Sequence, residues 1–457
     1  MITLGRQGPD APLFAVLKLA GPLVVAYAGQ QLMSVVDAAV VGRISAEAMA
    51  GTSLAGGLFA GTMVLGMGVL GGMDPLASQG VGAGDLTRAR RVYGAALKLS
   101  RLMSLPLTAL LALAWWLLHP IGVDPASIQE CGVYLVTRCV GLLPLFMYIS
   151  GRGMAQSMGH GRPVLVATIG ANLINVPMSV YLAFTPEQAG ALGLGHIGAG
   201  LGVAGVGLAS TASSLLQLWI MHRSVKAIGG GALPPAPGEV AEVFRMGWPI
   251  GLQLGAEVGI FAGVTVLMGR FGPVVTSGHH VALMLASFTF TICMGLSGAT
   301  SAMVGQAVGE GDLRRARAAG RAGLGAAAVF MGCNGLMFWT FAEPLAWLLT
   351  DKGHVVQVAI PLLHVAALFQ VSDGLQAVGA GAWRGLGRTR APMIMNLVGH
   401  WAVGFPLAMW LAYGTTEGPR GLWWGLTAGL TAVALLLAIG FEIVALKTPT
   451  PSTPKAG

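Results

Sequence analysis

Acidic residues lie inside long apolar stretches of this sequence, where a carboxyl group is costly and therefore informative about chemistry. Asp37, Glu257 and Asp373 each occur within such a stretch, and Asp74 occurs near the end of another. An ionised group in hydrocarbon costs at least about 2.5 kcal/mol, so a functional role is the first hypothesis. A carboxyl group far from a basic partner either takes up a proton or holds a cation. These acids therefore indicate ion binding or proton exchange.

Glu257 and Asp373 belong to the same half of the chain and could act together. A pair of carboxylate oxygens with backbone carbonyls suits a hard cation such as Na⁺, which makes these two residues the candidate metal ligands. The alternative for Asp37 and Glu257 is an interhelical hydrogen bond, for instance to Arg138. Arg138 lies in the middle of an apolar stretch, whereas the other Lys and Arg residues lie in the connections or in the flanks of the stretches. It could equally extend towards an interface.

Other polar residues near the apolar stretches have simpler interpretations. Asp74 precedes Pro75 beside a basic connection, which favours an interfacial ion pair or a role at a helix end. His279 and His280 adjoin another apolar stretch, where packing is favoured over a proton relay.

The elements that carry these residues must be membrane-spanning helices. Hydrophobic residues make up 54% of the 457 residues, charged residues only 10%, and the mean hydropathy is +0.73, whereas soluble chains carry about 25% charged residues. A spanning segment in lipid must satisfy its own backbone hydrogen bonds, and these runs are too long for barrel strands. Twelve spans are predicted, at residues 14–41, 49–74, 91–118, 128–151, 163–184, 197–222, 244–269, 277–304, 320–342, 355–381, 392–413 and 421–446.

The basic residues predict the orientation of the spans. Of the 26 Lys and Arg, 21 fall in the N-terminus, the even-numbered connections with their flanks and the C-terminus, 4 fall in the odd-numbered loops, and Arg138 lies within a span. Basic residues favour the cytoplasmic side, so both termini are predicted to be cytoplasmic. The net charge of +8 is then a topology signal, and no nucleic-acid partner is expected.

The chain contains an internal repeat. Residues 79–90 reappear as residues 306–317 with the shared pattern Gln-x-x-Gly-x-Gly-Asp, and the offset is 227 residues. Asp85 and Asp312, which end this pattern, are predicted to cap the helices that follow. Each half holds six spans, so the halves should be two six-helix bundles related by a pseudo-two-fold axis along the membrane normal.

This repeat predicts the domain boundaries and an alternating-access carrier. We expect an N-lobe at residues 1–225, a cytoplasmic linker at 226–243, a C-lobe at 244–447 and a cytoplasmic tail at 448–457. In transporters built from repeats, the substrate binds between the bundles, and rocking of the bundles alternates access. Gln30 and Gln253 lie on the first span of each bundle and are candidates for the substrate cleft, although interhelical contacts would explain them equally well.

Several motifs together resemble the multidrug and toxic compound extrusion (MATE) family, in its NorM-like branch. They are the duplicated Gln-x-x-Gly-x-Gly-Asp pattern, Phe369–Gln376, Trp383–Gly387 and Gly200–Ala209. The resemblance covers about residues 14–446. It implies an exporter of small cationic, amphipathic drugs that is driven by inward flow of Na⁺ or H⁺ and needs no other cofactor.

The resemblance also implies roles for individual residues. Glu257 and Asp373 match the acids of the C-lobe cation site, and Asp37 matches the N-lobe acid, which exchanges a proton or contacts the substrate. Asn175 matches a polar group that completes the N-lobe site. Ser179 stands where relatives carry Asn, which is a departure from the family pattern.

The remaining expectations concern class and location. No constellation typical of a membrane enzyme is present, so we expect a transporter and not an enzyme. The alternative is a flippase for lipid-linked precursors, although that activity would need a strongly cationic cleft for pyrophosphate. We expect a monomer in the bacterial cytoplasmic membrane whose partners are its substrates and the lipid bilayer.

Overall fold

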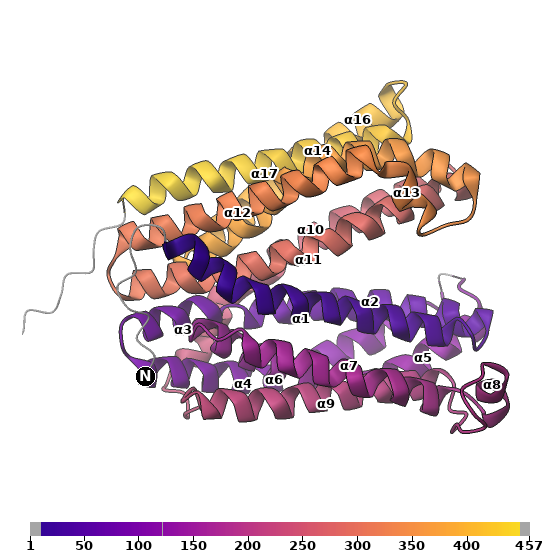
Figure 1. The fold of residues 1–457 in the computed structure, drawn as a ribbon, viewed down its shortest axis with the longest axis horizontal. Helices are drawn as coiled ribbons and strands as arrows, with labels where there is room; N and C mark the ends of the chain where they lie inside the picture. The colour runs from indigo at the N-terminus through magenta and orange to yellow at the C-terminus, as the bar shows by residue number, and fades with distance from the viewer. Residues whose placement is uncertain (1–10, 121, 448–457) are drawn as a thin grey trace, which may run out of the picture. The chain divides into compact units, whose positions relative to one another are not determined.

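The structure is a computed structural model that describes residues 11–120 and 122–447 (Figure 1). The predicted tail at 448–457 and the first ten residues of the predicted N-lobe lie outside the described residues. All regular elements of the described chain are helical. They are α1 (Ala11–Val41), α2 (Ala46–Leu70), α3 (Met73–Gly82), α4 (Leu86–Trp116), α5 (Pro125–Cys139), α6 (Leu142–Ser157), α7 (Arg162–Ala183), α8 (Pro186–Ala191), α9 (Val203–Ala227), α10 (Glu239–Gly269), α11 (Pro273–Gly309), α12 (Leu313–Thr340), α13 (Ala342–Trp347), α14 (Gly353–Gly385), α15 (Arg390–Leu397), the π-helix η1 (Val398–Gly404), α16 (Phe405–Gly414) and α17 (Pro419–Lys447).

The number of spans agrees with the sequence. Within the described residues, eleven helices are long and apolar enough to cross a membrane, and a bent pair of shorter helices supplies a twelfth. The prediction of an all-α, multi-pass membrane protein is therefore confirmed.

The fourth predicted span, at 128–151, consists of two helices and not of one. Helices α5 and α6 meet at an angle of 50°, and Val140 and Gly141 form the break. Pro144 explains it, because proline lacks the N–H that would bond to the Val140 carbonyl and its ring clashes with that carbonyl. The break places Arg138 in the last turn of α5.

Contacts divide the chain into two compact units. Unit 1 comprises Met1–Val24, Asp74–Asp85 and Leu252–Gly457, and unit 2 comprises Val25–Met73 and Leu86–Gly251. The units differ from the predicted lobes because short segments of α1, α3 and α10 pack with the opposite half of the chain. The lobe boundaries remain a prediction.

Unit 2 is built from helices that run side by side. Helix α7 packs along α9, α6 packs against both α4 and α9, and α2 packs along α5 (Figure 1). Between α9 and α10, residues 228–238 are not helical, and they fall within the predicted linker.

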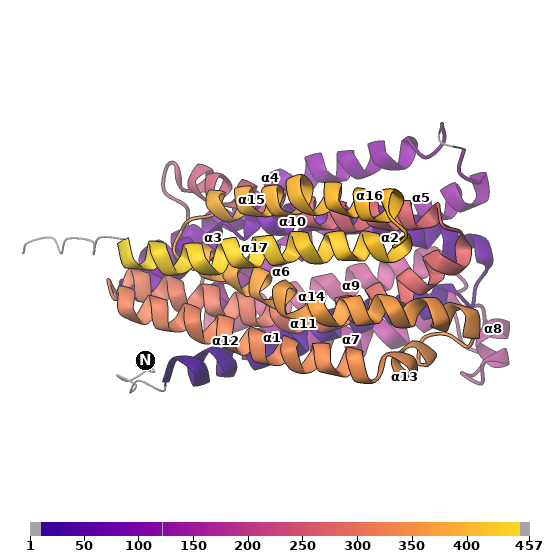
Figure 2. The ribbon, with the colours of Figure 1, turned by 90° about the horizontal axis from the view of Figure 1, so that it is seen from above.

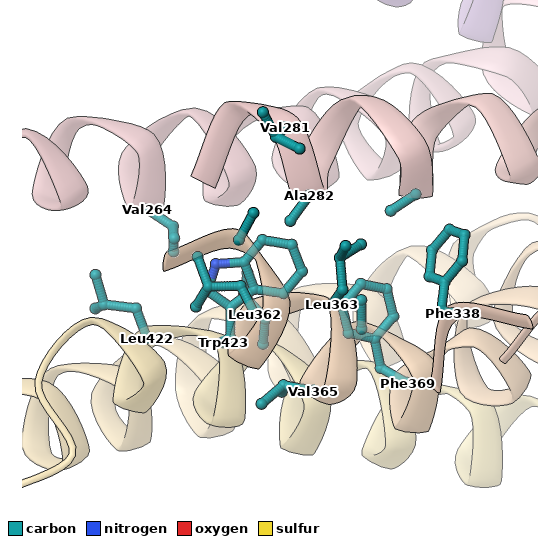
Figure 3. Close-up of a cluster of buried hydrophobic side chains, with 14 of the residues drawn as sticks. Val264, Val281, Ala282, Phe338, Leu362, Leu363, Val365, Phe369, Leu422 and Trp423 are labelled. Atoms are coloured by element: carbon teal, nitrogen blue, oxygen red, sulfur yellow. The ribbon is translucent and has the colours of Figure 1, made fainter. Parts of the chain in front are cut away.

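Unit 1 is organised around α14. This helix packs against α11, α12 and α17. On another side, α17 packs against α15, η1 and α16 (Figure 2). Figure 3 shows the apolar core between these helices, in which Trp423 lies among Val264, Leu362 and Leu422. The Trp423 ring stacks on Phe369 with ring centroids 5.6 Å apart. This packing fixes α14, which carries Asp373.

The duplicated pattern marks the same turn in both halves of the chain. Gly84 and Gly311 have φ angles of +75° and +76°, a left-handed conformation that favours glycine. Asp312 is the N-cap of α12, where its carboxylate accepts a hydrogen bond from the Arg315 backbone N–H at 2.9 Å. The pattern therefore ends one helix and starts the next, as predicted for Asp312.

The duplicated segments also pack against each other, within unit 1. A Cβ on Gly82 would lie 1.9 Å from the carbonyl oxygen of Gln306, and a Cβ on Gly309 would lie 2.1 Å from the carbonyl oxygen of Gln79. In both cases the atom that the Cβ would meet belongs to the backbone of the other segment, and each position is the counterpart of the other under the repeat. Glycine at these positions therefore permits a close helix crossing.

Candidate functional site

Asp37 is held by hydroxyl groups from two other helices of unit 2. Ser179 Oγ on α7 donates a hydrogen bond to Oδ1 over 3.2 Å, and Ser210 Oγ on α9 donates to Oδ2 over 2.6 Å. Asn175 lies one turn before Ser179, fully buried beside Asp37. Neither polar atom of its amide has a hydrogen-bond partner within the described part of the chain. The structure thus brings the predicted residues Asn175 and Ser179 to Asp37.

Asp37 lines a cavity of about 400 Å³ within unit 2, a volume in the range of small-molecule sites. Its polar lining includes Gln30, Ser34 and Asp37 on α1, Ser210, Ser214 and Gln217 on α9, and Tyr134 and Arg138 on α5. The residues on α1 and on α9 follow the spacing i, i+4, i+7, which places them on one face of each helix. The sequence therefore directs one polar stripe of each helix into the cavity.

Arg138 supplies the positive charge of this cavity. Its Nη1 donates to Ser214 Oγ over 3.2 Å, and its Cζ lies 4.6 Å from the centroid of the Phe59 ring. Both Arg138 and Asp37 line the cavity, yet they form no ion pair within the 4.0 Å limit in the described residues. The direct contact considered from the sequence is therefore not made, and the two charges stay apart.

The second acidic site lies in unit 1 and centres on Glu257. Its Oε2 accepts hydrogen bonds from Gln376 Nε2 on α14 at 2.8 Å and from Asn396 Nδ2 on α15 at 3.5 Å. The amide oxygens of Gln376 and Asn396 have no hydrogen-bond partner in the described residues. One carboxylate and two buried amide oxygens are therefore grouped at one place.

Asp373 shares a cavity of about 340 Å³ with Glu257. Asp373 is 6% exposed, and no hydrogen bond reaches its side chain from any residue that the structure describes. Phe261, Thr265 and Phe290 also line this cavity. No cluster of three His, Cys, Asp or Glu residues with metal-binding geometry occurs in the described chain, so any cation here would depend on two carboxylates and neutral oxygens.

His279 has a structural place beside this cavity. Its Nε2 lies 2.9 Å from Thr265 Oγ1, and its Nδ1 accepts a hydrogen bond from Trp423 Nε1 at 3.2 Å. His279 is fully buried, while the neighbouring His280 is exposed. Because Nδ1 is an acceptor, the proton of the neutral ring is on Nε2. This supports the packing interpretation of His279.

The π-helix η1 adjoins the Glu257 site. Asn396 lies on α15 just before η1, and Trp401 in η1 donates from Nε1 to the carbonyl oxygen of Ala256 at 3.1 Å. His400, also in η1, is fully buried and neither ring nitrogen has a partner in the described residues. π-Helical turns are rare and are frequent at functional sites. Here η1 directly follows α15, which carries Asn396, and its Trp401 is hydrogen-bonded to Ala256, the residue before Glu257.

Comparison with known proteins identifies the family. The sequence profile of the MatE family matches residues 22–181 and 249–410. The chain belongs to the MatE family. The matched stretches start 227 residues apart, which is the offset of the internal repeat. MatE proteins are transporters, so this chain is a membrane transporter and not an enzyme.

Relatives of known sequence cover nearly the whole chain. It is 35% identical over 443 residues to a probable multidrug resistance protein NorM of Deinococcus radiodurans, covering 93% of this chain and 94% of the relative. It is 32% identical over 443 residues to a probable NorM protein of Pseudomonas putida, with 95% of each chain covered. Among solved structures, a eukaryotic MATE transporter superposes with a TM-score of 0.85 and 20% identity over 97% of both chains, which supports the fold.

The structure adds residues to the two candidate sites that the sequence did not single out. The main additions are Ser210, which contacts Asp37, and Asn396, which contacts Glu257. The signal available for Ser210 was its spacing of seven residues from Gln217, which places both polar residues on the same face of a helix. Of the two predicted cleft residues, Gln30 lines the Asp37 cavity. Gln253 is buried on α10 one turn before Glu257 and does not line the Glu257 cavity. Their roles in substrate binding remain predictions.

Proposed function

We propose that this protein exports small cationic, amphipathic compounds in exchange for Na⁺ or H⁺ by alternating access. The observation that carries the proposal is a pair of cavities lined by buried acids, one with Asp37 in unit 2 and one with Glu257 and Asp373 in unit 1. The names of the NorM relatives support multidrug resistance as the biological role. The internal repeat supports alternating access, because exchange between two halves is typical of repeat-built transporters.

The Glu257 site has the chemistry expected for a coupling ion. Two carboxylates provide the charge, and the unpartnered amide oxygens of Gln376 and Asn396 provide neutral ligands. An all-oxygen donor set suits a hard cation. A proton on either carboxyl group would equally satisfy the site, since a buried pair of like charges favours sharing one proton. The site therefore supports ion coupling with either ion.

The Asp37 site supports the exchange of a cationic substrate. Asp37 is 7% exposed and lines a cavity together with the aromatic residues Phe59 and Tyr134. An aromatic face attracts an organic cation that has left water. A cation could therefore be bound through both Asp37 and the aromatic rings.

The same proposal includes location and orientation. A chain with eleven to twelve spans and bacterial relatives fits the bacterial cytoplasmic membrane, with both termini cytoplasmic as the basic residues indicate. Single cysteines at position 43 or 352, in odd-numbered loops, should react with an impermeant maleimide added to whole cells. Labelling of a cysteine at position 388 instead would indicate the opposite orientation.

The precursor flippase is the less favoured function. Of the residues that line the two cavities, Arg138 is the only Lys or Arg, whereas a pyrophosphate group needs several such donors. The acidic residues that line the cavities favour organic cations as substrates.

The test is dye efflux from proteoliposomes with a Na⁺ gradient and a pH gradient imposed separately. Efflux of a cationic dye should depend on one of the gradients and should be lost in Asp37→Asn and in Glu257→Gln. Glu442→Gln is the matched control, because Glu442 is an acid in a partly exposed ion pair with Arg321. Unaltered efflux in both site variants would remove these acids from the mechanism, and efflux without either gradient would refute ion coupling.

A further inference from the structure

Arg138 is the most unusual residue of the Asp37 cavity. A cationic side chain within a span costs several kcal/mol, and a cavity that took only organic cations would be weakened by it. Arg138 nevertheless lines the cavity together with Asp37. Its presence therefore calls for a negatively charged partner.

Asp37 does not act as that partner in the structure. Both carboxylate oxygens of Asp37 accept hydrogen bonds from serine hydroxyls, Ser179 on one side and Ser210 on the other. The Arg138 guanidinium is placed by Ser214 and by the Phe59 ring. Separate supports thus keep the negative and the positive group apart in one cavity.

The guanidinium retains the capacity to bind an anion. Its bond to Ser214 uses one of five N–H groups. A guanidinium binds a carboxylate through two parallel hydrogen bonds, a geometry that a lysine does not offer. The cavity volume of about 400 Å³ suits a ligand of drug size. Arg138 and Asp37 together suit a ligand that carries one charge of each sign.

We propose that Arg138 determines substrate specificity by binding a carboxylate on zwitterionic amphiphiles whose cationic group faces Asp37. This inference rests on the proposed export function and names a substrate class for the Asp37 cavity. Arg138 contacts the substrate and discriminates between a free carboxylate and its ester. The Phe59 ring, which contacts the guanidinium, holds the flat group in place.

A purely structural role makes a different prediction. Arg138 lies in the last turn of α5 at the 50° bend, where a positive charge favours the helix C-terminus. If this were its only role, its replacement would alter folding or would lower transport of all substrates to the same extent. Discrimination between two otherwise identical substrates would not change.

The test compares a rhodamine dye that has a free benzoate group with its methyl ester. The two dyes share the cationic ring system and differ in the carboxylate alone. Initial rates are measured in proteoliposomes for the wild-type protein, Arg138→Gln and Arg138→Lys. Arg101→Gln is the control, because Arg101 lies exposed on α4 of the same unit and outside the cavity.

We expect the acid-to-ester rate ratio to fall about tenfold in Arg138→Gln, to recover partly in Arg138→Lys and to stay at the wild-type value in Arg101→Gln. An unchanged ratio, or an equal loss for both dyes, overturns the proposal. If the wild-type protein moves neither dye under any gradient, export of these compounds has failed as a function. In that case, dye binding to the purified protein tests whether Arg138 recognises the carboxylate. In Arg138→Gln the dissociation constant of the acid should rise about tenfold relative to that of the ester. An equal change for both dyes overturns the proposal.

Discussion

Adding one methyl group where the duplicated segments cross should lower the stability of the protein by an amount that can be worked out from the structure. In Gly82→Ala the new Cβ would lie 1.9 Å from the carbonyl oxygen of Gln306, and it would also meet the carbonyl carbon and Cα of that residue at 2.6 and 2.8 Å. Real Cβ atoms essentially never approach closer than 3.0 Å, so the helices must separate by roughly 1.1 Å, the difference from 1.9 Å. All three atoms belong to the backbone, so no side-chain rotation relieves the overlap.

The expected free energy follows from two opposing effects. Overpacking costs about 1–3 kcal/mol, while alanine in a helix is favoured over glycine by about 1 kcal/mol. We expect Gly82→Ala to lower the free energy of unfolding by about 2 kcal/mol, because an overlap with backbone atoms lies at the upper end of the overpacking range. Gly325→Ala is the control, since Gly325 lies on α12 of the same unit with no heavy atom within 4 Å of its added Cβ. The control should be stabilised by up to about 1 kcal/mol.

The assay is reversible unfolding of the purified protein in mixed detergent micelles, followed by tryptophan fluorescence. Gly309→Ala, whose Cβ would meet the Gln79 carbonyl oxygen at 2.1 Å, should cost a similar amount. The double variant should cost less than the sum, because one separation of the helices relieves both overlaps. Equal stability of Gly82→Ala and Gly325→Ala would refute the reasoning, and strict additivity of Gly82→Ala and Gly309→Ala would refute a shared crossing.

Two further predictions concern single hydrogen bonds. Ser210→Ala removes the 2.6 Å hydrogen bond to Asp37. Because a hydrogen bond to a charged group contributes about 1.5–3 kcal/mol, gradient-driven dye efflux at low substrate concentration should fall at least tenfold. A wild-type rate of efflux would contradict this prediction. Trp423→Phe keeps an aromatic ring against Phe369 but removes the bond to His279, so it should lower the free energy of unfolding by about 1 kcal/mol and leave dye efflux intact. A loss of efflux with unchanged stability would instead indicate that His279 takes part in transport.

Much of the fold was predictable because membrane helices are specified locally. Each span needs about 20 apolar residues and satisfies its own backbone hydrogen bonds, so composition along the chain was enough to locate the spans. Proline inside a span predicts a bend, but the division of the fourth span into α5 and α6 did not follow from the sequence. Pro144 was visible in the sequence, but proline bends some membrane helices and breaks others according to how neighbouring groups satisfy the freed carbonyl.

The candidate site was predictable only in part. Asp37, Glu257 and Asp373 were found because a carboxyl group in an apolar span is rare and costly. Ser210 and Asn396 were missed, since serine and asparagine occur in spans for many reasons and their partners lie 173 and 139 residues away in the chain.

The sequence by itself determined the helical class, the number of spans, the internal repeat and the presence of buried acids, because each depends on local composition or on direct comparison of segments. Only the tertiary structure decided which polar groups surround each acid and that Arg138 shares a cavity with Asp37 without pairing with it. Those facts depend on how each helix is rotated and packed against its neighbours. Side-chain contacts between distant segments set that rotation.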